Sequence, residues 1–94
     1  MITAIVISDF ELGRVVITRG ALATLKEHDV TCAVVRHASS DWGNVCQADW
    51  EANDLALTEG TRLFSVYEDQ GGMKFWIITE ADRSVTTVLL PSEY

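Results

Sequence analysis

The chain has 94 residues, of which 48% are hydrophobic and 22% are charged, and its formal net charge is −7. This length and composition predict a single globular domain, 1–94, with enough apolar surface for one core. An acidic chain lacks the basic surface that binds phosphates, so direct binding to nucleic acid or to an anionic membrane is not expected. No apolar run reaches the ~20 residues that cross a bilayer, and no secretory signal is recognisable, which indicates a cytoplasmic protein.

The N-terminal half predicts short strands followed by helices. Residues 4–7 and 14–17 are rich in β-branched apolar side chains and flank a turn, so we expect one or two strands there. Thr18 is placed to accept a hydrogen bond from an amide in the first turn of a helix over residues 19–28. Residues 31–36 predict either a second helix or a strand, because their valines weaken the helical signal.

The C-terminal half predicts one helix and three strands. Apolar residues recur at helical spacing over residues 47–59 and form one face: Ala48, Ala52, Leu55 and Ala56. Gly60 follows this helix as a left-handed C-cap. Residues 62–67, 74–80 and 84–90 read as strands joined by turns. The predicted fold class is therefore α+β, with a short N-terminal strand or strands, two to three helices, and then a three-stranded antiparallel β-meander.

Several stretches resemble a family of small uncharacterised proteins carried on bacterial plasmids and integrative elements. The matching segments cover most of the chain from Leu12 onward and are LGRVVITRGAL, RHASSDWG, WEANDLAL, EGTRLFSVY and FWIITEADRSVTTVLLPSEY. The resemblance implies an accessory protein of a mobile element and assigns no catalytic residue. One departure lies at Ser39-Ser40, where a glycine often precedes the aspartate, so the turn before Asp41 differs from the family pattern.

His37 and Asp41 form the most suggestive catalytic pair. A carboxylate can orient an imidazole and raise its pKa, which produces a general base. Ser39 and Ser40 add hydroxyl groups, but the nucleophile-elbow motif of serine hydrolases is absent. The alternative is structural, in that Asp41 or Asn44 caps the following helix and His37 hydrogen-bonds the loop.

A second constellation lies on the expected sheet and in its last turn. Its members are Ser65, Thr79, Arg83 and Thr86 or Thr87. Together with His37 they match the layout of small ribonucleases such as barnase and RelE, in which arginine stabilises a phosphorane and histidine acts as acid or base. The structural alternative is that solvent-exposed threonines pair across neighbouring strands.

The negative charge is concentrated in the second half of the chain. Residues 41–94 carry ten acids and three bases, which accounts for the whole net charge. Four acids lie on the expected helix without a basic residue four positions later: Asp49, Glu51, Asp54 and Glu59. A solvated helix face explains this pattern, and the functional alternative is a surface that mimics DNA phosphates or complements a basic protein. Trp42 is either a core anchor or an exposed contact, and Trp76 is expected to be packed.

Three functional hypotheses follow. The first is a non-enzymatic, defence-counteracting factor (anti-restriction or anti-CRISPR-like) that binds a basic protein partner through Asp49, Glu51, Asp54, Glu59 and Trp42. The second is a metal-independent hydrolase or ribonuclease-like enzyme that uses His37, Asp41, Arg83, Thr79 and Thr86. The third is a homodimer that pairs through an unprotected edge strand. Cys32 and Cys46 lack the spacing of a zinc site, so neither a metal nor a cofactor is expected.

Overall fold

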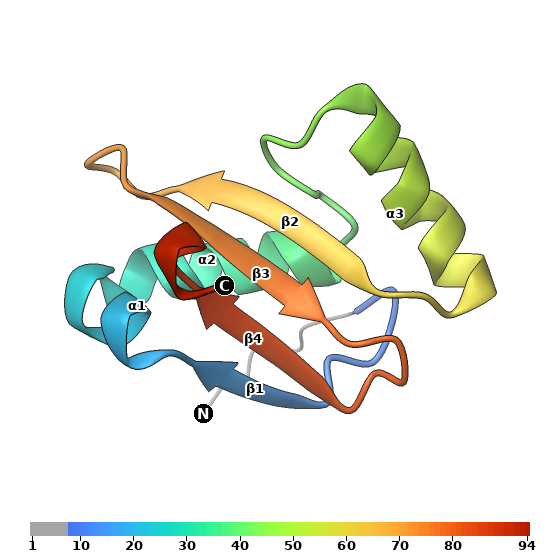
Figure 1. Cartoon of the computed structure of the whole chain (residues 1–94), viewed down its shortest axis with the longest axis horizontal. Coiled ribbons are helices and arrows are strands. Elements are labelled where there is room, and N and C mark those ends of the chain that lie inside the picture. The colour runs from blue at the N-terminus through green and yellow to red at the C-terminus, as the bar shows by residue number, and fades with distance from the viewer. Residues whose placement is uncertain (1–7) are drawn as a thin grey trace, which may run out of the picture.

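The computed structural model describes residues 8–94. In chain order its elements are β1 (Arg14–Ile17), α1 (Arg19–Thr24), α2 (Glu27–Ala38), α3 (Gln47–Glu59), β2 (Leu63–Glu68), β3 (Lys74–Thr79), β4 (Val85–Leu89) and the 3-10 helix η1 (Pro91–Glu93). The expected α+β class is confirmed (Figure 1). The expected strand over residues 4–7 lies outside the described residues. Within residues 8–94, no helix combines the length and the hydropathy that a membrane span requires.

The four strands form one mixed sheet in the order β1-β4-β3-β2 (Figure 1). β2, β3 and β4 pair antiparallel as the expected meander, and Thr79 lies opposite Thr86. β1 pairs parallel with β4, with Val15 opposite Thr86, so the sheet is not purely antiparallel. The alternation in β2 places Leu63, Ser65 and Tyr67 on one face, and the structure buries that face.

The segment after β1 contains two helices rather than one. Thr18 caps α1 as expected, because its hydroxyl oxygen accepts a hydrogen bond from the Ala21 amide at 3.3 Å. Leu25 then adopts an extended backbone conformation and joins the buried core, so the expected helix over 19–28 is divided at this point. α2 follows, which confirms the helical alternative for residues 31–36.

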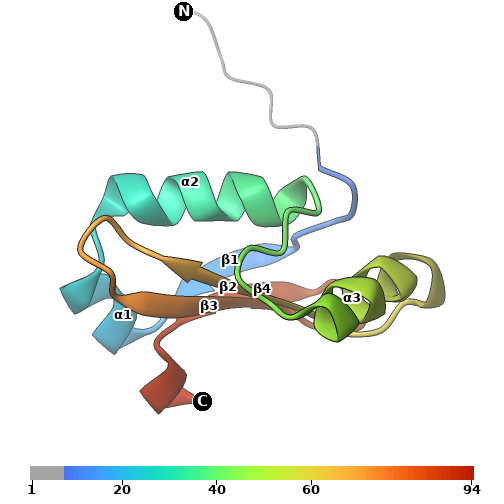
Figure 2. The ribbon, with the colours of Figure 1, turned by 90° about the horizontal axis from the view of Figure 1, so that it is seen from above.

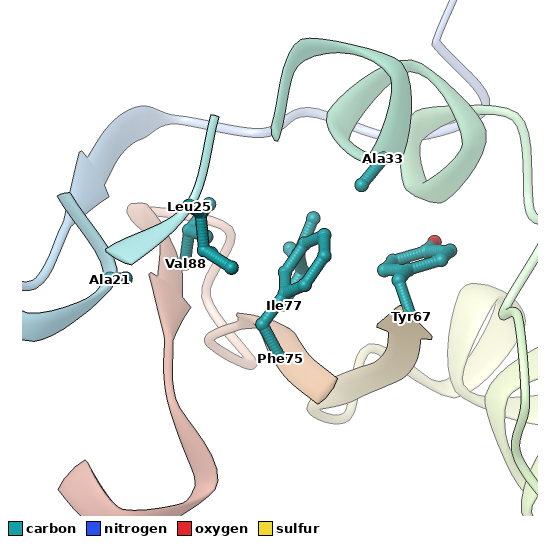
Figure 3. Close-up of a cluster of buried hydrophobic side chains, with 7 residues drawn as sticks. All are labelled: Ala21, Leu25, Ala33, Tyr67, Phe75, Ile77 and Val88. Atoms are coloured by element: carbon teal, nitrogen blue, oxygen red, sulfur yellow. The ribbon is translucent and has the colours of Figure 1, made fainter. Parts of the chain in front are cut away.

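α2 covers one face of the sheet, and η1 lies on the opposite side (Figure 2). The main core fills the space between α2, α1 and the sheet (Figure 3). Its buried members are Ala21, Leu25, Ala33, Tyr67, Phe75, Ile77 and Val88. Burial of these apolar side chains is the main driving force for the α2–sheet packing. Acids in the first turn of α2 and Arg36 in its last turn complement the helix dipole.

α3 lies beside the sheet, along the edge of β2, rather than over a face (Figure 2). The Asn53 side-chain amide forms two hydrogen bonds with the backbone of Phe64. Farther along the strand, the Val66 amide donates to the Trp42 carbonyl, and the Val66 carbonyl accepts from the Asn44 amide. The outward backbone groups of Phe64 and Val66 are therefore paired with α3 and the loop that precedes it.

The predicted apolar face of α3 is wrong, because the helix lies beside the sheet rather than over it. Ala48, Ala52 and Leu55 are exposed, and Leu55 has 56% of its surface exposed. The buried residues of the helix are Asn53 and Ala56. A sheet edge is narrow and presents backbone polar groups, so it buries only a thin strip of a neighbouring helix. A second small core of Trp42, Ala56 and Leu63 fills the space between α3 and the sheet.

The end of α2 is closed by a left-handed turn at Ser39-Ser40. The Asp41 amide donates to the Arg36 carbonyl and the Ser40 amide to the His37 carbonyl, which is the pattern of a Schellman cap. Ser40 occupies the left-handed position of this cap, with φ at 63°. Glycine is the residue that adopts this conformation most easily. Ser40 therefore occupies a left-handed position that favours glycine.

Candidate functional site

Four buried polar side chains from α2, β2, β3 and β4 form a continuous chain of hydrogen bonds. His37 Nδ1 lies 2.6 Å from Ser65 Oγ, and its Nε2 lies 2.8 Å from Thr79 Oγ1. Thr79 continues to Thr86 Oγ1 at 2.8 Å, and Thr86 donates to the Leu12 carbonyl oxygen at 2.6 Å. This chain links α2 to all three antiparallel strands.

The last acceptor fixes the direction of the hydrogen bonds from His37 Nε2 to Leu12. A carbonyl oxygen only accepts, so Thr86 gives its single hydroxyl proton to Leu12 and must accept from Thr79. Thr79 then accepts from the Nε2–H of His37. His37 therefore has a proton on Nε2, and because burial keeps the ring neutral, Nδ1 accepts from the Ser65 hydroxyl.

The surroundings of His37 keep it neutral and closed to a substrate. The residues His37, Ser65, Thr79 and Thr86 each have 0% of their surface exposed. Burial, with a smaller contribution from the positive charge of Arg83, lowers the pKa of His37 from 6.5 to about 4. The expectation of solvent-exposed threonines is thus wrong, and the arrangement is a buried structural network.

Asp41 belongs to a different site from His37. Its carboxylate pairs with Arg36, whose Nε lies 2.8 Å from Asp41 Oδ2, and it accepts from the Gly43 amide at 3.1 Å. The Arg36 hydrogen bond holds the pKa of Asp41 below its usual range. The predicted His37–Asp41 pair is therefore wrong, because the turn at Ser40 directs the aspartate back toward Arg36. The helix-capping alternative is also wrong, since α3 has no side-chain cap.

Arg83 is a structural arginine rather than an anion-binding one. Its guanidinium donates to the carbonyl oxygens of Ala56 at 3.0 Å, Thr61 at 2.6 Å and Glu80 at 3.2 Å. These bonds tie the end of α3 to the turn between β3 and β4. The ring of Phe10 lies beside the guanidinium carbon at 5.8 Å and contacts the His37 ring edge-on. Both terminal nitrogens of the Arg83 guanidinium thus donate to backbone carbonyls.

Trp42 is a core residue, so its expected contact with a partner is wrong. It has 0% of its surface exposed and stacks against Phe10. Its indole N–H donates to Asp54 Oδ1 at 2.9 Å. Asp54 thus has a structural role in holding the second small core against α3.

The remaining acids of α3 are exposed and lack a cationic partner in the described structure. Asp49, Glu51 and Glu59 all lie on the surface. Glu51 accepts a hydrogen bond from Gln47 one turn earlier. The ion pairs found among residues 8–94 join Arg36 to Asp41 and Arg62 to Glu80, and neither involves α3. Within residues 8–94, the outer face of α3 therefore presents negative charge without an ion-pair partner, beside the exposed Leu55.

The sheet face opposite α2 carries an aromatic hollow that the sequence did not predict. The hollow has a volume of about 310 Å³ and is lined by Arg62, Phe64, Trp76, Ile78 and Tyr94. Trp76 meets Phe64 and Tyr94 edge-on, with ring centroids 5.0 and 5.6 Å apart, and it is only half-buried. The signal in the sequence is the strand alternation, which puts Phe64 and Trp76 on the face away from Tyr67 and Phe75.

Metal ligands do not gather in the described part of the chain. Among residues 8–94, no three His, Cys, Asp or Glu side chains lie close enough together to hold a metal ion. Comparisons with family models, with curated proteins and with solved structures find no match to this chain. The resemblance to plasmid-borne proteins therefore stays a prediction from the sequence.

Proposed function

We propose that this protein is a non-enzymatic binding protein whose α3 presents an acidic face to a protein partner with a basic surface. The observation that carries this proposal is the exposure of Asp49, Glu51 and Glu59, which lack a cationic neighbour within residues 8–94. Complementary charge of this kind accelerates association and selects the partner.

The rigid attachment of α3 supports the proposal. The helix is fixed to β2 by Asn53, to the β3–β4 turn by Arg83 and to the small core by the bond from Trp42 to Asp54. A surface that is held in place before binding loses little conformational freedom when the partner arrives. α3 is therefore suited to present its charges in a fixed arrangement.

The resemblance to mobile-element proteins suggests the class of partner. Restriction and CRISPR complexes bind nucleic acid in basic grooves, and a helix that exposes several carboxylates can occupy such a groove in place of phosphates. We propose on this ground that the partner is a basic-grooved component of such a system, and that this protein counteracts it.

The enzymatic alternative receives less support. His37, Thr79 and Thr86 are completely buried and bonded to one another, Arg83 binds backbone carbonyls, and Asp41 pairs with Arg36. General acid–base chemistry requires a group within hydrogen-bond reach of the substrate. Proton transfer from this network to a bound molecule would require the core to open.

The aromatic hollow offers a further contact for the same partner. Trp, Tyr and Arg are the residues that contribute most binding energy at protein interfaces, and Trp76, Tyr94 and Arg62 all line this hollow. Tyr94 is the most exposed of these aromatic rings, with 69% of its surface accessible. Tyr94→Ala is therefore expected to weaken partner binding while leaving the fold intact. Thermal unfolding followed by circular dichroism checks that the variant is folded.

The proposal is tested by charge reversal on α3. Glu51→Lys combined with Glu59→Lys removes two exposed acids without disturbing the structural Asp54 or the favourable Asp49 in the first helical turn. The matched control, Glu27→Lys with Glu68→Lys, makes the same change in net charge at exposed sites away from α3. Both variants are compared with wild type for capture of a basic nucleic-acid-binding protein from bacterial lysate, with and without competing duplex DNA.

We expect wild type and the control to capture the partner, DNA to compete with it, and the α3 variant to lose it. A second readout is the transformation of a restricting strain by unmodified plasmid, which wild type and the control are expected to raise and the α3 variant is not. Equal capture and equal transformation by all three proteins would contradict the proposal.

A further inference from the structure

The two edges of the sheet differ in how their backbone groups are paired. The β2 edge is occupied by Asn53 and by the loop before α3. At the other edge, the Arg14 amide donates to the Ser84 carbonyl and the Thr18 amide to the Val88 carbonyl, each at 3.0 Å. The backbone N–H and C=O groups of the even-numbered residues therefore point toward β4. Amide and carbonyl groups alternate in direction along a strand, so those of Val15 and Ile17 point away from the sheet. No strand of the described part of the chain pairs with this side of β1.

Apolar hollows lie along the open edge of β1. One, of about 400 Å³, is lined by Leu12, Val15 and the α2 residues Val30, Val34 and Val35. Another, of about 510 Å³, continues past Val15 to Ile17, Leu22 and Leu25. Val15 itself has 47% of its surface exposed. An uncovered strand edge beside apolar side chains is a template for another strand.

We infer that β1 pairs antiparallel with β1 of a second copy about a two-fold axis at Val16. In this register Val15 of each copy lies opposite Ile17 of the other. Residues opposite each other in such positions exchange two hydrogen bonds, so the two pairs form four. All the outward amide and carbonyl groups of Val15 and Ile17 in both copies are then paired. The two four-stranded sheets become one continuous sheet of eight strands.

The charges around β1 fit this self-pairing. The register places Arg14 opposite Thr18 of the second copy, so the two Arg14 side chains do not face each other. Glu11 precedes β1 and Arg19 follows it, so antiparallel pairing brings the acidic end of one strand toward the basic end of the other. Glu11 and Arg19 are both exposed, and neither belongs to an ion pair found among residues 8–94. A second copy therefore matches this edge in both hydrogen bonding and charge.

The dimer leaves α3 free. β1 and β2 are the opposite edges of the sheet, so pairing at β1 puts the two α3 helices at the two ends of the assembly. If the proposed function holds, the dimer presents two acidic faces and binds a two-fold symmetric partner with increased avidity. Self-association itself does not depend on that function.

Cross-linking tests the position of the axis directly. In a background with Cys32→Ser and Cys46→Ser, which removes the two exposed thiols, Val16→Cys is expected to form a disulfide-linked dimer on mild oxidation. Residues on the axis of such a pair lie about 4.5 Å apart at Cα, which a disulfide spans. The matched control is Leu55→Cys on α3, which is expected to remain unlinked.

Light scattering after size-exclusion chromatography, over a range of concentrations, tests assembly in the full chain. Wild type is expected to be a dimer and Val15→Lys a monomer, while Leu55→Lys, the same change at an exposed apolar residue on the opposite edge, stays a dimer. Val15→Pro is a second variant that is expected to be monomeric. It removes the outward-pointing Val15 amide, which makes no hydrogen bond with β4, so the sheet within each copy is kept. Circular dichroism confirms that each variant is folded.

Three results would overturn the inference: a monomeric wild type, a Val15→Lys variant that stays dimeric, or dimerisation that disappears on removing residues 1–7 while Val16→Cys fails to cross-link. The last result would assign the edge to the N-terminal segment instead. A monomer that still captures the basic partner would refute the dimer alone, and a dimer that captures nothing would refute the proposed function alone.

Discussion

The side-chain amide of Asn53 pairs with the backbone of Phe64 as a neighbouring strand would. Asn53 Nδ2 donates to the Phe64 carbonyl at 2.7 Å, and the Phe64 amide donates to Asn53 Oδ1 at 3.0 Å. A buried asparagine on a helix thus covers the edge of β2 and fixes α3 beside it.

Asn53→Ala should destabilise the fold by about 2 to 3 kcal/mol, because it leaves two partly buried backbone groups without partners. Urea unfolding measures the change, and hydrogen exchange should show lost protection at the Phe64 amide. The control is Asn44→Ala, an exposed position where the backbone amide makes the contact with Val66. A loss of stability in Asn44→Ala as large as that in Asn53→Ala would contradict the edge-covering role.

The buried His37 should make stability depend on pH between about 4 and 6.5. Its folded-state pKa is about 4 and its ordinary value is 6.5, so the unfolded chain binds a proton in this window and the folded chain does not. The contribution of His37 is therefore fully present above pH 6.5, falls as the pH drops toward 4, and changes no further below that. The full difference is about 3 kcal/mol in the free energy of unfolding.

Urea unfolding at several pH values measures this dependence, and comparison with variants separates it from carboxylate titration. His37→Gln retains a donor and an acceptor for Thr79 and Ser65 but does not titrate, so its stability should vary less with pH between 4 and 6.5. His28→Gln alters the exposed histidine and should behave as wild type. The same slope in all three proteins would show that His37 is not held neutral by the fold.

Gly43 and Gly72 should respond very differently to the same substitution. Both have a positive φ, at 74° and 85°. A Cβ at Gly43 would overlap the Val66 carbonyl oxygen and the Tyr67 ring, whereas a Cβ at Gly72 meets open space. Gly72→Ala should cost about 1 kcal/mol from backbone strain alone. Gly43→Ala adds a clash in the packed interior and should cost at least about 3 kcal/mol. Equal melting temperatures of the two variants would contradict this account.

Arg83→Lys should loosen the end of α3 without removing a positive charge. A lysine ammonium cannot reproduce the fork of the guanidinium toward Ala56 and Thr61, so a loss of about 1 to 3 kcal/mol is expected. Hydrogen exchange at the Gly60 amide, which closes α3, should accelerate. Arg19→Lys at an exposed position is the control and should change stability by less than about 0.5 kcal/mol.

Local signals predicted most of the secondary structure. The alternation of β2, the β-branched runs of β1 and β4, the cap at Thr18 and the left-handed Gly60 depend on residues within a few positions of one another. The break at Leu25 was missed because that residue is held extended by the core rather than by its neighbours in sequence.

The predicted pairing of His37 with Asp41 is wrong because two residues that are close in sequence can point their side chains in different directions. The last turn of α2 points His37 into the sheet, and the cap at Ser40 returns Asp41 to the outer surface beside Arg36. The actual partners of His37, Ser65 and Thr79, lie 28 and 42 residues away. Sequence spacing does not reveal contacts over such separations. The grouping of Ser65, Thr79 and Thr86 with His37, which the structure confirms, came from the expected layout of the sheet.

The sequence alone determined the α+β class, the three-stranded meander and the concentration of acids on one helix, because each follows from composition or from short-range periodicity. The tertiary structure alone decided that α3 lies along a sheet edge, that Trp42 is buried while Trp76 lines a surface hollow, and that no strand within residues 8–94 pairs with the outer edge of β1. These features depend on which surfaces of distant segments meet, and burial of the common core sets that arrangement rather than any local pattern.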